Sequence, residues 1–178
     1  MNRVMRENVI KYYESSRTHY TTYHNHKELS AWAGLILFVF FAGFINLMKL
    51  PVGFEVDAAI TITVFVLIVS VLVFRYISNQ LEMKDLGGAY VAASIAFTTD
   101  LITGNITDEE LDEYMKVEES PDVQAQSRHV LPYKFLKKAK VLNSRGRGFQ
   151  DTTKHMIYGI LFIVSLLLVA SKWGQVIA

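Results

Sequence analysis

Two side chains near the N-terminus, an arginine and a histidine, have types and a spacing that would let them act together in catalysis. Arg17 and His24 are seven residues apart, and two turns of an α-helix bring positions i and i+7 to one face. Roughly 0.6 Arg–His pairs at a permitted spacing are expected by chance in a chain with this many arginines and histidines. The alternative, which we favour, is an interfacial patch in which these residues join neighbouring tyrosines and histidines just before a membrane span.

Other catalytic or metal-binding patterns are missing from the sequence. There is no cysteine, so thiol chemistry, disulfide scaffolds and Cys-ligated zinc are excluded. His24 and His26 would face about 200° apart on a helix and could not share a metal ion. Phosphate-binding loops, serine-hydrolase elbows and zinc-protease motifs are also missing. We therefore expect no metal and no cofactor, and enzymatic activity stays open but is not favoured.

Two oppositely charged blocks lie in the middle of the chain. Residues 108–122 hold eight acids and one lysine, and residues 128–154 hold eight basic residues and one acid. These blocks are either a solvated face and a basic membrane flank, or surfaces that attract each other within a chain or between copies. RNA binding by the basic block is not favoured, because few aromatic residues accompany it. The candidate oligomer contacts in these blocks are Glu109, Glu110, Asp112, Glu113, Lys134, Lys137, Lys138 and Lys140.

Three stretches without any charged residue predict membrane spans. They cover residues 29–48, 58–74 and 156–171, and a helix rising 1.5 Å per residue needs about 20 residues to cross roughly 30 Å of hydrocarbon. The two shorter stretches can lengthen by snorkelling, the third through Lys172, with Trp173 at the interface. Burial of all three stretches in a soluble core is disfavoured, because 178 residues are too few for a core of that size.

The distribution of basic residues predicts the orientation of the spans. Sixteen lysines and arginines lie in residues 1–28 and 75–154, whereas only Lys49 and Lys172 lie on the other side. Because basic residues stay in the cytoplasm, we expect a cytoplasmic N-terminus, with the first span retained. The predicted order is a cytoplasmic amphipathic helix 1–28, a span 29–49, an external turn 50–57, a span 58–77, a cytoplasmic helical domain 78–154, a span 155–173 and an external tail 174–178.

The regions outside the spans also have helical patterns, so the predicted fold class is all-α. Residues 1–29 contain no glycine or proline and predict a helix that runs straight into the first span. The small residues at 87–97 indicate a close-packed helix, with a re-entrant segment as the alternative. Thr107, followed by Asp108 to Glu110, predicts a capping box that starts a short helix ending at about residue 119.

The polar and small residues inside the spans are the remaining candidates. The uncharged stretches at the centre of the spans hold no Asp, Glu, Lys, Arg or His, which argues against an ion-coupled transporter. Thr63 and Ser70 are seven residues apart and form a thin polar stripe, which either lines a water-filled lumen in an oligomer or bonds back to carbonyls of its own helix. Gly34 and Gly43 are candidates for close helix contacts.

This layout resembles the small membrane accessory protein of type VI-B CRISPR systems, which carries a divergent HEPN-like motif, and more loosely other short pore-type effectors of bacterial defence. The motif that carries the resemblance is Arg17 to His24, with Thr18 in place of the usual Asn or Asp. The resemblance implies an inner-membrane homo-oligomer whose pore depolarises the membrane during phage infection and strengthens an RNA-guided ribonuclease.

The function that we predict is therefore that of an oligomeric membrane pore in antiviral defence, with the lipid bilayer and further copies of the chain as direct partners. One alternative is a membrane-tethered HEPN-like ribonuclease that uses Arg17 and His24. The other is a membrane scaffold without a pore.

Overall fold

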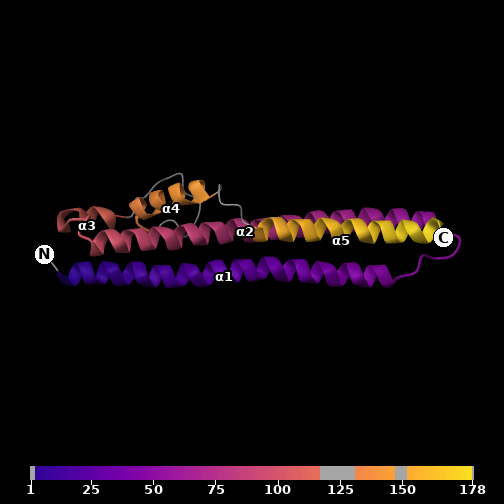
Figure 1. Ribbon diagram of the computed structural model, residues 1–178, viewed down its shortest axis with the longest axis horizontal. Helices are drawn as coiled ribbons and strands as arrows, with labels where there is room; N and C mark the ends of the chain where they lie inside the picture. Colours follow the sequence, from indigo (N-terminus) through magenta and orange to yellow (C-terminus); the bar gives the residue numbers. More distant parts are fainter. Residues whose placement is uncertain (1–2, 117–130, 147–151, 178) are drawn as a thin grey trace. The chain divides into compact units, whose positions relative to one another are not determined.

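The computed structural model describes residues 3–116, 131–146 and 152–177. Within those ranges helices are the regular structure and there is no strand, which confirms the all-α prediction. The helices, shown in Figure 1, are α1 (Arg3–Leu47), α2 (Glu55–Ile102), α3 (Asp108–Tyr114), α4 (Tyr133–Gly146) and α5 (Thr152–Ile177).

Three of these helices, α1, α2 and α5, are long and apolar enough to cross a membrane. α1 has 45 residues and α2 has 48, so each is about 70 Å long and more than twice the thickness of the hydrocarbon layer. Each of the two helices therefore extends well beyond a bilayer.

The chain forms two compact units. The head unit comprises Met1–His26 and Met83–Phe149, and the span unit comprises Lys27–Glu82 and Gln150–Ala178. α1 and α2 contribute to both units without a break, α3 and α4 belong to the head unit, and α5 belongs to the span unit. The N-terminal helix and the central segment, which the sequence analysis treats as separate regions, thus fold together in the head unit.

Some predicted boundaries differ from the observed ones. The link between α1 and α2 covers residues 48–54 instead of 50–57, and α5 continues to Ile177. Gly53 has a φ of 85°, which glycine adopts without strain, and the Glu55 carboxylate accepts a hydrogen bond from the Gly53 N–H at 2.8 Å. Acidic residues in the first turn of α2 also complement its positive end, so the helix begins earlier than the uncharged stretch.

The short helix α3 begins as predicted but ends sooner. The Thr107 hydroxyl accepts a hydrogen bond from the Glu110 N–H, and the Glu110 side chain accepts one from the Thr107 N–H, which completes the capping box. The helix ends at Tyr114 instead of near residue 119. After the helix, the Lys116 carbonyl accepts a hydrogen bond from the Tyr133 N–H at 3.0 Å; residues 117–119 lie outside the described ranges.

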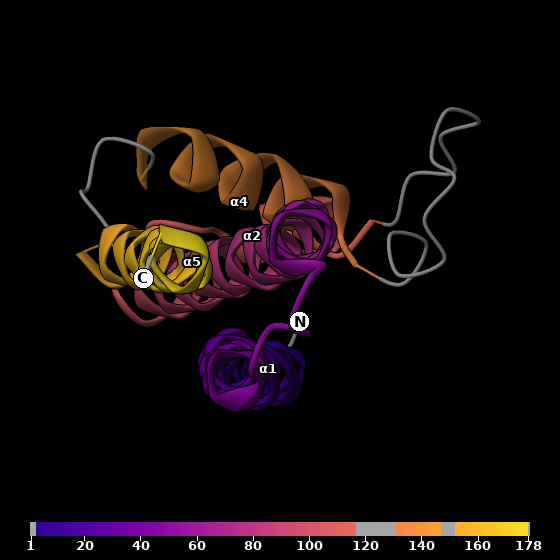
Figure 2. The same cartoon turned by 90° about the vertical axis from the view of Figure 1, so that its right-hand side faces the viewer.

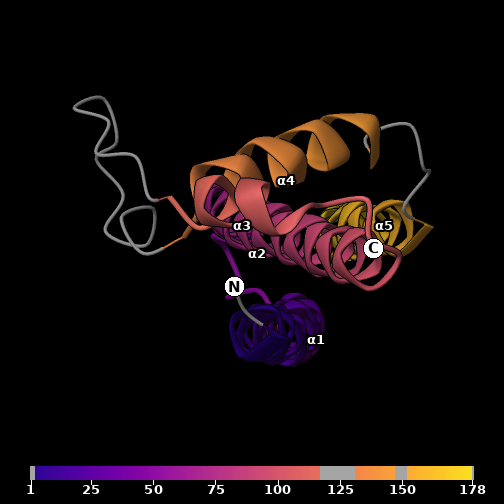
Figure 3. The same ribbon diagram turned by 90° about the vertical axis from the view of Figure 1, so that its left-hand side faces the viewer.

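The head unit is held together by an aromatic core. Tyr13 of α1 stacks on Phe97 of α2 and on Phe135 of α4, with ring centroids 5.3 and 5.6 Å apart. Seven residues further along α1, Tyr20 meets Tyr90, seven residues back along α2. This matched step of seven is the spacing of antiparallel helices packed side by side. Figure 3 shows α3 and α4 lying against α2.

The small-residue stretch at 87–97 lies inside α2 and forms no separate or re-entrant segment. A Cβ on Gly87 would lie 3.2 Å from a Tyr23 ring carbon, and one on Gly88 would lie 3.4 Å from His24 Nδ1. Ala93 and Ser94 are fully buried. The small side chains let α1 and α2 approach closely, which outweighs the low helix propensity of glycine.

The span unit has an apolar core between α1, α2 and α5. Figure 2 shows α5 lying beside α2. Gly34 permits the contact between α1 and α2, because a Cβ there would lie 2.9 Å from the Tyr76 ring, whereas one on Gly43 would meet nothing within 4 Å. The buried members of this core are Ala31, Leu35, Phe38, Ala42, Ile45, Val66, Ile77, Leu81, Ile157, Leu161 and Leu168.

Candidate functional site

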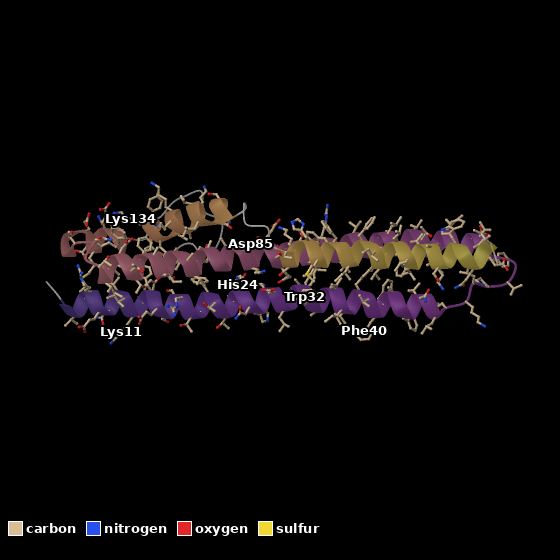
Figure 4. The ribbon with its side chains drawn as sticks, viewed as in Figure 1. Lys11, His24, Trp32, Phe40, Asp85 and Lys134 are labelled. Carbon is tan, nitrogen blue, oxygen red and sulfur yellow. The ribbon has the colours of Figure 1, made fainter. Side chains whose placement is uncertain are left out.

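The predicted pair Arg17 and His24 does not form a catalytic arrangement within the chain. Arg17 is exposed and His24 is half-buried, and the two lie about 10 Å apart along the axis of α1. His24 points toward α2 (Figure 4), and its Nδ1 lies 2.9 Å from the Lys84 carbonyl oxygen. A carbonyl only accepts, so Nδ1 must donate. The ring thus joins two helices of the head unit.

The charged blocks meet within the chain at one described ion pair. Lys134 Nζ lies 3.0 Å from a Glu113 carboxylate oxygen and 4.1 Å from the centre of the Tyr114 ring. The Thr107 backbone N–H and hydroxyl lower the pKa of Glu110. Asp112, Lys137, Lys138 and Lys140 are exposed, and the Glu109 side chain lies outside what the structure describes.

The predicted polar stripe of α2 faces α5. The Ser70 hydroxyl is 2.7 Å from the Val66 carbonyl and 3.0 Å from the Ser165 hydroxyl, which is itself 2.7 Å from the Leu161 carbonyl. Ser70 is only 9% exposed. The two serine hydroxyls have only two protons for these three contacts. The hydrogen bond between Ser70 and Ser165 therefore competes with the bonds that each serine donates to a carbonyl of its own helix.

The other residue of the stripe also reaches α5. The Thr63 hydroxyl donates to the Ala59 carbonyl at 2.8 Å and accepts a hydrogen bond from Trp173 Nε1 at 3.1 Å. We call the set Thr63, Ser70, Ser165 and Trp173 the seam. In a single chain the seam is closed, and each of its three hydroxyls lies within hydrogen-bond distance of a carbonyl of its own helix and of a side chain on the facing helix.

The cation near the end of α5 is buried. Lys172 is predicted to lengthen the third span by snorkelling, but its side chain has no exposed surface. Lys172 Nζ instead donates to the carbonyl oxygens of Asn46, at 3.1 Å, and Met48. These carbonyls end α1, so Lys172 acts as a C-terminal cap supplied by another helix.

The far end of α2 is capped in the same way. The Arg6 guanidinium of α1 donates to the carbonyls of Leu101 and Ile106 at 2.9 and 2.8 Å. Neither α1 nor α2 has a basic residue in its own last turn. The absence of basic residues at both helix ends is the sequence signal that could have pointed to caps from elsewhere in the chain.

No group of three or more His, Asp or Glu side chains in the described ranges is arranged to hold a metal ion. Comparison of the chain with protein-family models, with curated proteins and with solved structures gives no match.

Proposed function

We propose that this protein is a homo-oligomeric pore of a bacterial inner membrane, with its head unit in the cytoplasm, which depolarises the membrane in antiviral defence. The single observation that carries the proposal is the seam, a line of hydrogen-bonding side chains inside otherwise apolar helices. Polar groups at membrane depth are expensive and are often functional.

The apolar outer surface of the span unit supports a place in the bilayer. Phe40 is 72% exposed and points away from α2 in Figure 4. Bulky apolar side chains also cover the outer faces of α2 and α5. The exposed set includes Leu37, Phe44, Leu67, Leu72, Phe162 and Leu167. Lipid and neighbouring copies are the two environments that suit this surface.

Separation of α5 from α2 would turn the seam into a pore lining. The Ser70 and Ser165 hydroxyls each keep a carbonyl of their own helix when the helices part, so little hydrogen bonding is lost. Copies packed around the opened seam would then present hydroxyls to a shared lumen. The orientation rests on the sixteen-to-two bias in basic residues.

The link to antiviral defence and to an RNA-guided ribonuclease rests on the resemblance to the type VI-B accessory protein. It is tested by phage challenge of cells that carry the ribonuclease with or without this chain. We expect protection to be stronger with it, and equal protection would remove this part of the proposal. The ribonuclease alternative gains nothing from the structure, because His24 is turned toward α2.

The experiment that tests the pore combines a mass measurement with a leakage assay. Purified protein is sized in detergent and then reconstituted into liposomes that contain a fluorescent dye or potassium. We expect an oligomer larger than a dimer and leakage that rises with protein content. A monomer or dimer, or tight liposomes, would contradict the pore and favour the scaffold.

A further inference from the structure

Three consecutive residues of α5 hold one end of the span unit, which we call the turn end because it carries the link between α1 and α2. Lys172 donates to the carbonyls of Asn46 and Met48. Ser171 donates to the Asn46 side-chain oxygen at 2.7 Å, and Trp173 donates to the Thr63 hydroxyl at 3.1 Å. α5 is thereby tied to both α1 and α2 at this end.

The bonds of Lys172 to the end of α1 differ in kind from the contact between Ser70 and Ser165, which we call the serine contact. The last carbonyls of α1 have no partner inside their own helix and carry the negative end of its dipole. A buried ammonium needs such acceptors, because burial without them is costly. Lys172 and α1 therefore satisfy each other.

The serine contact is replaceable. Ser70 and Ser165 each have a carbonyl of their own helix within 2.7 Å, so α2 and α5 can part there without leaving a hydroxyl unpaired. At the turn end, withdrawal of Lys172 would leave its ammonium and the end of α1 without this bond. α5 is thus held more firmly at the turn end, where it bonds to α1 and to Thr63 of α2, than at Ser165 near its middle.

We propose that Lys172 is a positioning residue that fixes α5 at the turn end and makes that end the pivot about which α5 leaves α2. The fixed contact follows from the local geometry, and the pivoting motion rests on the proposed function. The part of the seam at Ser70 and Ser165 would then open from the end where α5 begins, and Trp173 would stay bonded to Thr63 at the turn end.

The fixed contact is tested by the fluorescence of Trp173, the neighbour of Lys172. In a Trp32→Phe background Trp173 is the one remaining tryptophan, and its quenching by acrylamide in reconstituted protein reports how firmly the turn end is packed. Lys172→Met should raise the quenching constant at least twofold, and Lys172→Arg, which keeps the charge, should change it less.

Lys49→Met is the matched control, because Lys49 belongs to the same end of the span unit but is exposed. It should leave the quenching constant unchanged. A quenching constant in Lys172→Met equal to that of the parent would overturn the fixed contact, whether or not the protein conducts ions. An equal rise in Lys49→Met would overturn it too, since the effect would then come from any loss of charge.

The pivot is tested by a disulfide between Asn46→Cys and Ser171→Cys, whose native side chains touch. Liposome leakage should persist in the oxidised protein at more than half of the reduced level. Loss of leakage on oxidation, with recovery on reduction, would overturn the pivot while leaving the pore in place. Tight liposomes in both states would overturn the pivot together with the proposed function, and the quenching result would still decide the contact.

Discussion

Two arginines on α1 show how differently one residue type can act in this chain. Arg6 joins the N-terminal part of α1 to two carbonyls at the end of α2, at 2.9 and 2.8 Å. Arg17, eleven residues further on, is exposed. The planar guanidinium of Arg6 donates to the two carbonyls from its two terminal nitrogens.

We therefore expect Arg6→Ala to lower the free energy of unfolding by about 1–3 kcal/mol, because hydrogen bonds to a charged group are lost and carbonyls are left unpaired. Arg17→Ala should change it by no more than about 0.5 kcal/mol. Thermal unfolding of the two variants in the same detergent provides the comparison. Equal losses for both arginines would show that the contact with α2 contributes nothing.

His24 yields a prediction about chemistry. Because its Nδ1 donates to the Lys84 carbonyl, we expect His24→Ala to loosen the packing of α1 on α2 and to lower the free energy of unfolding by about 1 kcal/mol. We expect no RNA cleavage that depends on His24. Incubation of purified parent and variant with labelled single-stranded RNA measures this. Cleavage by the parent that disappears in both His24→Ala and Arg17→Ala would establish the ribonuclease instead.

At the scale of the helices, two glycines of α1 form a matched pair. Gly34 faces Tyr76 of α2, and Gly43 lies on the open side of the same helix. Gly34→Val should destabilise the span unit by about 1–3 kcal/mol, since the added methyl groups collide with the tyrosine ring. Gly43→Ala should be neutral or stabilising by up to about 1 kcal/mol through helix propensity.

Unfolding of both variants in detergent, followed by circular dichroism, measures the difference. If Gly43→Ala is the more damaging substitution, the open side of α1 is a contact between copies and not a lipid-facing surface. If Gly34→Val is tolerated, the close approach of α1 and α2 at Tyr76 is unnecessary for stability.

Local patterns in the sequence predict the three helices of membrane length and the capping box at Thr107, but neither the separate helix α4 nor the continuity of α2 through residues 87–97. Uncharged stretches, missing helix breakers and a Thr-x-x-Glu motif each act within a few residues. The caps by Arg6 and Lys172 join residues far apart in the chain, and the partner of Ser70 lies on another helix. Such contacts depend on the register between helices, which no local pattern specifies.

For the whole molecule, the sixteen-to-two bias in basic residues makes a prediction about topology. A reporter fused after Asn2, or inserted within residues 108–150, should be active in the cytoplasm, and one fused after Ala178 should be active outside. Each fusion is made with two reporters, one that is active only in the cytoplasm and one that is active only outside it, so that both ends of the chain are tested. A cytoplasmic C-terminus would mean that α5 does not cross the membrane.

The pore depends on opening of the seam, and the chain's lack of cysteine permits a direct test. Ser70→Cys and Ser165→Cys, introduced together, replace hydroxyl oxygens that are 3.0 Å apart, so oxidation should join α2 to α5. Each single-cysteine variant serves as a control. Potassium flux from proteoliposomes should stop in the oxidised double variant and return on reduction, whereas undiminished flux with the disulfide formed would show that ions do not pass along the seam.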